Sequence, residues 1–149
     1  MLVRCVLIIL FLCLSAASGA AEARIVKVLP HLLDAQGRNS LAPSLYERDA
    51  YQAHLRATPE LVSALRFDVQ YKSDTREPIV LRIELRGSKM PLGRIRVFET
   101  DLQPRRFFSS WGHLHLDKEL YDEIGPIIAW RATLRRDGFV LADLESFLW

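Results

Sequence analysis

The stretch Ile79-Val-Leu-Arg-Ile-Glu-Leu-Arg86 decides the fold, because its side chains alternate between apolar and charged with a period of two. On an extended strand, the apolar positions 79, 81, 83 and 85 share one face, and the charged positions 82, 84 and 86 share the other. The pattern indicates a half-buried β-strand, with one face in a core and one face in water.

The same period continues outward from this strand. Phe67–Tyr71 precedes it with alternating apolar residues, and Ile95 and Val97 follow it after a turn that contains Gly87 and Pro91. Further strands are expected in four other segments: Arg24–Leu33, Phe107–Leu116, Ile127–Arg135 and Phe139–Leu148. The first of these is expected to be an edge strand that Pro30 breaks or bends.

One helix is expected among these strands, over Leu45–Arg56. Ser44 and Glu47 form a capping box at its start, and Thr58-Pro59 ends it. Its apolar residues are spread over more than one face, so we expect it to pack across an open end of the strands. Leu120–Ile124 is expected to form a helical turn before Gly125-Pro126.

The closing hairpin has two possible registers. A two-residue turn at Asp137-Gly138 would place Ala132 opposite Asp143, which brings a carboxylate to the core side. A three-residue loop, Arg136-Asp137-Gly138, instead pairs three apolar positions with apolar ones: Leu134 with Val140, Ala132 with Ala142 and Trp130 with Leu144. It also places Arg131 opposite Asp143 on the outer face, and because burial selects register we expect this second arrangement.

Short alternating strands joined by turn residues predict a mainly β fold, an antiparallel β-sandwich of about seven strands with one short helix between the first and second strands. Tyr121–Gly125, followed by Ala129–Leu134 and the closing hairpin, resembles the last third of immunoglobulin-like and fibronectin type III-like domains. This resemblance in pattern covers roughly residues 65–149 and implies that the third and sixth strands are neighbours. The chain also resembles small exported bacterial proteins of an uncharacterised family, which implies no particular activity.

The first 23 residues predict export. Arg4 precedes the apolar run Cys5–Leu14, and small residues then lead to Ala21-Glu22-Ala23, which is the order of a cleaved secretory signal peptide. Cleavage is expected after Ala23, with Ala20 and Ala21 as alternatives. We therefore expect a signal peptide over 1–23, a single domain over 24–149, and a periplasmic or secreted location. The chain would be membrane-tethered if the signal were retained.

The composition excludes several classes of function. Both cysteines, Cys5 and Cys13, lie in the leader, so the mature domain has no thiol nucleophile, thiolate metal site or disulfide. The net charge of +2 is too small to favour nucleic acid as a partner. No nucleophile-elbow, zinc-protease or P-loop motif occurs, so we expect neither an enzyme nor a cofactor.

Two groups of residues are candidates for binding. Arg82, Arg86, Arg131 and Arg135 fall at outward positions of neighbouring strands and could hold an anionic glycan, a lipid headgroup or an acidic envelope protein. The alternative is that Glu84, Asp143 and Glu145 neutralise them. His113 and His115 share one face of a strand, which suggests a metal-binding protein or a metal-dependent hydrolase, although the sequence names no third ligand.

Aromatic side chains pose a similar choice. Trp130 is expected in the core, whereas Trp111 and the final Phe147-Leu-Trp149 either cover the ends of the sandwich or form an exposed partner surface. The sequence therefore predicts an exported, non-catalytic interaction or structural module, with the histidine pair as the alternative site.

Overall fold

A computed structural model describes residues 22–106 and 108–149, in which seven strands form two antiparallel sheets. The strands are β1 (Ala23–Leu33), β2 (Ala64–Ser73), β3 (Ile79–Gly87), β4 (Arg96–Leu102), β5 (Ser109–Asp117), β6 (Ile127–Arg136) and β7 (Phe139–Glu145). The helices are α2 (Leu45–Ala57), α3 (Lys118–Ile124) and a 3-10 turn at Pro59–Leu61. Residues 1–21, which carry nearly all of the expected signal peptide, lie outside the described residues.

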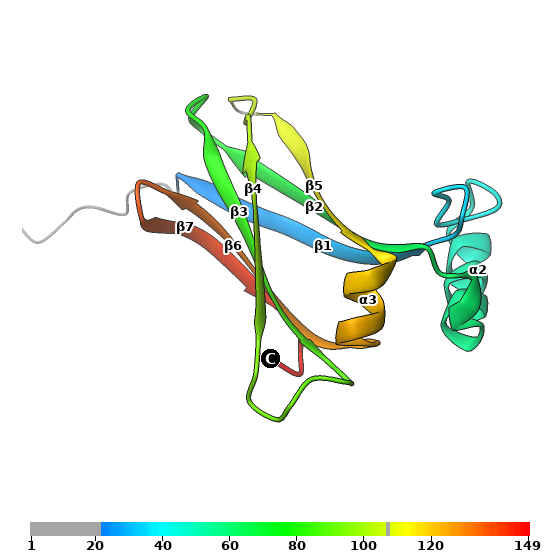
Figure 1. Cartoon of the computed structure of the whole chain (residues 1–149). Coiled ribbons are helices and arrows are strands. Elements are labelled where there is room, and N and C mark those ends of the chain that lie inside the picture. The colour runs from blue at the N-terminus through cyan, green and yellow to red at the C-terminus, as the bar shows by residue number, and fades with distance from the viewer. Residues whose placement is uncertain (1–21, 107) are drawn as a thin grey trace, which may run out of the picture.

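The sheets form two layers (Figure 1), one with strand order β1-β2-β5 and the other with order β4-β3-β6-β7. Their inward faces meet in one hydrophobic core, to which both sheets contribute fully buried residues such as Phe67, Val69, Leu81, Ile83 and Leu134. Among the described residues, the buried members of this core run from Ala23 to Leu134.

Strand β3 follows the sequence pattern residue by residue, since every odd position from Ile79 to Gly87 is buried and every even position is partly exposed. It pairs with β4 on one side and with β6 on the other. The third and sixth strands are therefore neighbours, as expected, and their outward arginines lie on one face of the four-stranded sheet.

The first strand is irregular at a different place from the one expected. β1 continues through Pro30, which lies opposite Phe67, and its register shifts instead between Ile25 and Lys27. An edge strand tolerates proline because one row of its backbone amides has no strand partner. The extra residue at Val26 moves the inward positions from odd numbers to even numbers, so that Val28 and Leu32 reach the core.

The predicted register of the closing hairpin is wrong. Arg136 pairs with Phe139 across a two-residue turn, in which both Asp137 and Gly138 have positive φ, at 50° and 84°. The register then shifts, so that Leu134 lies opposite Ala142 and not opposite Val140. One extra residue in β7 provides this shift.

The shift explains how a two-residue turn is compatible with an apolar inner face. Ala132 pairs with Leu144 and Arg131 with Glu145, each two residues beyond the predicted partner. Because the displacement is an even number, the same side chains still face the core, and Ala132 is fully buried. Trp130 is half-buried at the margin of the core, and its backbone bonds with Ser146.

The expectation of a single helix is also incomplete, because α3 forms a second helix between β5 and β6. Asp117 caps it by accepting a hydrogen bond from the Leu120 amide at 3.0 Å, a cap that was not among the sequence predictions. The helix packs closely on the end of β3, where a Cβ added at Gly87 would lie 2.2 Å from the Ile124 carbonyl oxygen. Only glycine fits at that position.

Helix α2 begins after Ser44, whose side chain accepts a hydrogen bond from the Glu47 amide. It lies beside one end of the three-stranded sheet (Figure 1) and buries only Gln52 and Leu55. Gln52 fastens the helix to β1 by bonding with both the amide and the carbonyl of Leu32, at 2.8 and 2.9 Å. No helix among the described residues has the length and apolar character needed to cross a membrane.

Candidate functional site

A buried carboxylate lies on the outer face of the three-stranded sheet. Asp68 occupies an outward position of the central strand β2, yet only 6% of its surface is exposed. The side chains of His31, Arg66 and His113 fold over it and exclude water. These four residues form what we call the Asp68 network.

The register of the sheet brings the network together. His113 on β5 lies directly opposite Asp68, and His31 on β1 lies opposite Arg66. Nδ1 of His31 is 2.9 Å from Oδ2 of Asp68, and Nδ1 of His113 is 2.6 Å from Oδ1. Arg66 completes the shell from its own strand, donating from Nε and Nη2 to the two oxygens at 2.8 and 3.0 Å.

The network keeps Asp68 ionised. Burial disfavours its charge, but the hydrogen bonds from His31, Arg66 and His113 outweigh burial and hold the pKa of Asp68 far below its usual range. An ionised carboxylate only accepts hydrogen bonds, so Nδ1 of each histidine carries the shared proton. Nε2 of each ring is therefore left for another partner. His31 is buried, whereas the side chain of His113 is 57% exposed.

An imidazole oriented through Nδ1 by a carboxylate is suited either to proton transfer or to metal ligation through Nε2. Among the described residues, however, no hydroxyl or other nucleophile is hydrogen-bonded to His113. Nor does any group of three His, Cys, Asp or Glu side chains within residues 22–106 and 108–149 have the arrangement of a metal site. His113 and His115 do share the outer face of β5, as predicted.

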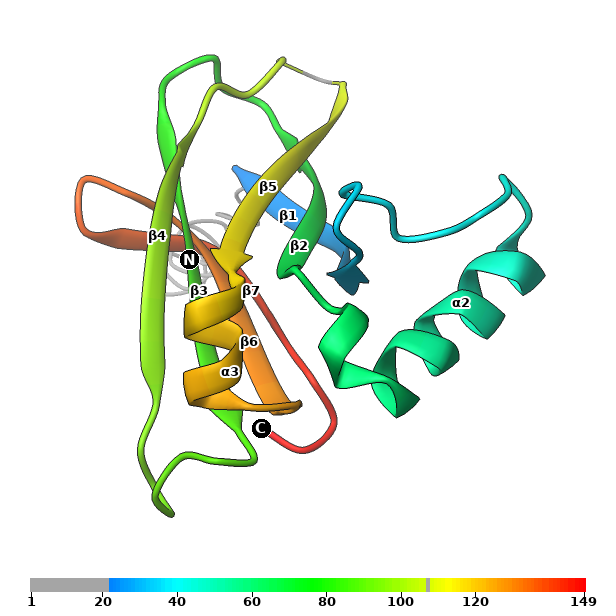
Figure 2. The same ribbon diagram turned by 45° about the vertical axis from the view of Figure 1, so that its right-hand side comes forward.

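A pocket of about 520 Å³ adjoins the network, and we call it the edge pocket. It lies between the end of β4 and the start of β5, and its lining includes Thr100, Asp101, Gln103, Arg105, Trp111 and His113. In Figure 2 these strand ends are joined by the loop at the top of the molecule. Gly112 lies beneath the pocket, where an added Cβ would meet the Leu102 side chain at 2.8 Å.

Trp111 gives the edge pocket an aromatic wall that is 44% exposed. The ammonium group of Lys27 lies 5.4 Å from the centre of its ring, across the width of the sheet. Arg105 lines the same pocket and forms no ion pair with an acidic side chain in the part of the chain that the structure describes. One cation thus lies over the exposed indole, and a second lines the pocket.

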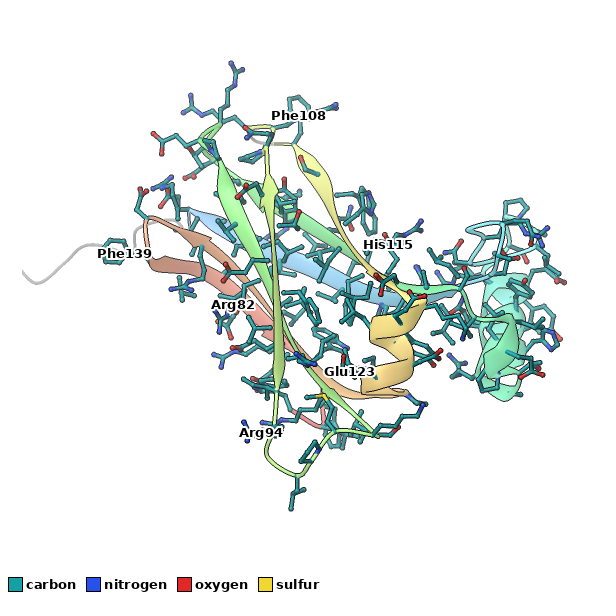
Figure 3. All side chains as sticks on the ribbon, in the orientation of Figure 1. Arg82, Arg94, Phe108, His115, Glu123 and Phe139 are labelled. Atoms are coloured by element: carbon teal, nitrogen blue, oxygen red, sulfur yellow. The ribbon has the colours of Figure 1, made fainter. Side chains whose placement is uncertain are left out.

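Three of the four predicted arginines lie close to acidic side chains on the outer face of the four-stranded sheet: Arg82, Arg131 and Arg135. Arg82 bonds with Glu84 at 2.9 Å and with Glu99 at 3.2 Å. Arg135 is also 4.0 Å from Glu99. Glu84 and Glu99 therefore offset much of the positive charge of these arginines. Arg82 is labelled in Figure 3.

The remaining two arginines are held more loosely. Nη2 of Arg131 is 3.8 Å from Asp143, the residue that was expected directly opposite it. Arg86 lies apart from the others and stacks on the Trp149 ring at 4.3 Å. The Nε atoms of three of these arginines are buried without an acceptor among the described residues: Arg86, Arg131 and Arg135.

Asp68 and His31 were not among the predicted site residues. The sequence does contain a signal that could have identified Asp68. It is an acidic residue at the centre of an apolar strand, where burying a charge is unfavourable unless hydrogen-bond partners surround it. Finding those partners required the register of β2 against both of its neighbours.

Sequence comparison adds no relative. No model of a known protein family matches the chain, and no curated protein that was compared with it is similar in sequence.

We predict that Asp68→Asn lowers the free energy of unfolding by about 1–3 kcal/mol at neutral pH, because it removes the charge from a buried network. The lowered pKa of Asp68 stabilises the fold above the unfolded value of about 4, and this contribution is lost as the pH falls toward the folded value. Urea denaturation should therefore show a gap between wild type and variant that shrinks in acid. The exposed Asp143→Asn is the control and should change stability by less than about 0.5 kcal/mol. A gap that does not depend on pH would contradict a stabilising, ionised Asp68.

Proposed function

We propose that this chain is an exported, non-catalytic β-sandwich domain that acts as a binding module, with its ligand in the edge pocket. One observation carries the proposal: an exposed indole and an imidazole fixed by a buried carboxylate line the same hollow. Rigid side chains in a concave site lose little entropy when a ligand binds, so Trp111 and His113 are suited to recognition.

An immunoglobulin-like or fibronectin type III-like arrangement is part of this proposal. The pairing of β3 with β6 and the three-plus-four division of strands support it. In the constant-type immunoglobulin arrangement, however, the fourth strand joins the sheet of the first two. Here β4 pairs with β3, so the strand arrangement differs from the constant type, and the fibronectin type III-like arrangement is the one that we propose.

Export rests on the leader pattern, and the structure bears on where cleavage would fall. Ala23 is buried and pairs with Ser73, and the Glu22 carbonyl accepts a hydrogen bond from the Asp74 amide at 3.1 Å. Cleavage after Ala20 or Ala21 preserves these contacts, whereas cleavage after Ala23 removes them. We therefore expect the intact mass of the exported protein to correspond to a start at residue 21 or 22. A mass that includes residues 1–20 would indicate tethering.

An anionic glycan fits the edge pocket best among the expected partners. An indole face packs against the apolar face of a sugar ring, and the polar side chains of Thr100, Gln103 and His113 can bond with hydroxyl groups. Lys27 and Arg105 form no ion pair within the described residues, and together they outnumber Asp101, the one acidic side chain in the described lining of the pocket. Their charges favour a ligand that carries carboxylates. The arginines of the other sheet are less suited to this role, because glutamates already bond with Arg82 and approach Arg135.

A metal-binding protein or metal-dependent hydrolase at His113 and His115 is the second candidate. The bond from His113 to Asp68 favours it, since a carboxylate commonly orients a histidine that ligates metal. It ranks below the glycan because no third ligand is present among the described residues. Zinc titration of the wild type and of a His113→Ala, His115→Ala variant separates the two functions.

We predict that residues 22–149 bind a uronic-acid polymer such as alginate more tightly than neutral dextran, as measured by calorimetry. Trp111→Ala and Arg105→Gln should each weaken binding about tenfold, which corresponds to about 1.4 kcal/mol for a lost stacking or charge contact. Arg131→Gln on the other sheet is the matched control and should bind normally. If Arg131→Gln loses affinity while Trp111→Ala does not, the site lies on the arginine face and our assignment is wrong.

A further inference from the structure

The turn between β3 and β4 presents one apolar side chain to solvent at its tip. Leu92 is fully exposed, and the Arg94 amide closes the turn by donating to the Pro91 carbonyl at 3.0 Å. Gly93 has φ +77°, the left-handed value that a type II turn requires at its third residue. Leu92 is thus held outward by a defined turn.

The base of this turn is fastened to the rest of the fold. The amides of Ser88 and Lys89 donate to the carbonyls of Pro126 and Ile124, at 2.9 and 3.0 Å. Arg96 forms an ion pair with Glu123 on α3. Leu92 is therefore held in an ordered turn, and its side chain contributes nothing to the core of this fold.

A second turn has the same design. The Trp149 amide donates to the Ser146 carbonyl at 3.0 Å, and this closes a turn with Phe147 at its second position. Phe147 is fully exposed and Leu148 is 61% exposed. Contact between the Trp149 ring and the Arg86 guanidinium fastens this turn to the end of β3, next to the first turn.

Both turns lie at the same end of the molecule in the two ribbon views (Figures 1 and 2). Three cations lie near the turns without an ion pair to an acidic side chain among the described residues: Arg86, Lys89 and Arg94. Lys89 donates to the Asp122 carbonyl at 2.8 Å, and the nearby Glu123 is paired with Arg96. Figure 3 shows Arg94 at this end, far from the labelled Phe108 and Phe139. Two protruding apolar tips are therefore combined with three cations that no carboxylate pairs.

We infer that this end of the molecule docks onto the surface of a bilayer that contains anionic phospholipid. Phe, Leu and Trp side chains enter the boundary between headgroups and acyl chains, while nearby Lys and Arg attract the negative headgroups. Side chains that stand clear of the surface suit a deformable bilayer, whereas a protein partner needs a complementary flat or concave surface. The edge pocket lies at the other end, so docking leaves it accessible.

Co-sedimentation with vesicles tests this inference on residues 22–149. The protein should pellet with vesicles that contain a quarter phosphatidylglycerol, and much less with pure phosphatidylcholine. Binding should fall steeply as sodium chloride is raised, because the attraction is screened. Failure to pellet with anionic vesicles, or equal binding to both kinds, would overturn the inference.

Matched variants locate the contact. A Leu92→Ser, Phe147→Ser double variant should lose at least tenfold in partitioning, and Arg94→Gln should lose about fivefold. Phe139→Ser removes an aromatic ring that is 74% exposed at the tip of the β6–β7 hairpin, and it should bind within twofold of wild type. If Phe139→Ser has an equal effect, the end is not selective and the inference fails.

Two further readouts distinguish a lipid contact from self-association and from glycan binding. If the wild type forms a dimer that the double variant abolishes, the turns are an interface between copies and not a lipid contact. Alginate binding by the double variant should be unchanged, so loss of vesicle binding and loss of glycan binding are independent outcomes.

Discussion

The two-residue alternation of apolar side chains in the central strands is the constraint on which the rest of the structure depends. It commits one face of each sheet to a shared core and leaves the opposite face for polar chemistry. In β3 the rule holds without exception from Ile79 to Gly87. Where another strand departs from it, a one-residue bulge restores the burial of apolar side chains, as at Val26 in β1.

The outward face of β2 shows that residues facing away from the core can form a buried polar network. A carboxylate on a half-exposed sheet is ordinarily solvated, but Asp68 is enclosed and remains charged because its neighbours donate to both of its oxygens. These bonds orient the rings of His31 and His113 through Nδ1, even though the His113 side chain is 57% exposed. The edge pocket therefore adjoins an imidazole whose orientation is set by a buried carboxylate.

Much of the fold could be predicted from the sequence, because a period of two needs only local information. The strand positions and the burial of Leu134 follow from it, whereas the pairing of β3 with β6 was implied by the resemblance to immunoglobulin-like domains. The partner of Ala132 in the hairpin does not, since both candidate turns contain the same Asp137-Gly138 pair. A bulge in β7 decides between them, and no local preference marks its position.

The candidate site was less accessible from the sequence for a related reason. His31, Asp68 and His113 are far apart along the chain, and only the register of three strands places them together. The arginines were found because they follow the strand period, and Glu84 and Asp143 were named as their acidic partners from the sequence. Glu99 on β4 could be assigned only once the sheet order was known. The sequence period thus identified which face of a strand each residue occupies, whereas the register of the paired strands was needed to identify which side chains are in contact.

The two ends of the two-sheet structure also differ in character. One carries the edge pocket, with an indole and an oriented imidazole, and the other carries two closed turns with apolar tips among cations. Both depend on a central core stiff enough to hold them apart. A flexible or differently layered core would leave neither surface with a defined shape.

Amide hydrogen exchange of residues 22–149 tests this dependence most directly. We expect the slowest amides to be those of the interior strands β2, β3 and β6, including the amides of Asp68 and Leu134. Helix α2 should exchange much faster, because it buries so little. If the amides of β3 exchange as fast as those of α2, the buried layer between the sheets does not exist and the two-layer architecture is wrong.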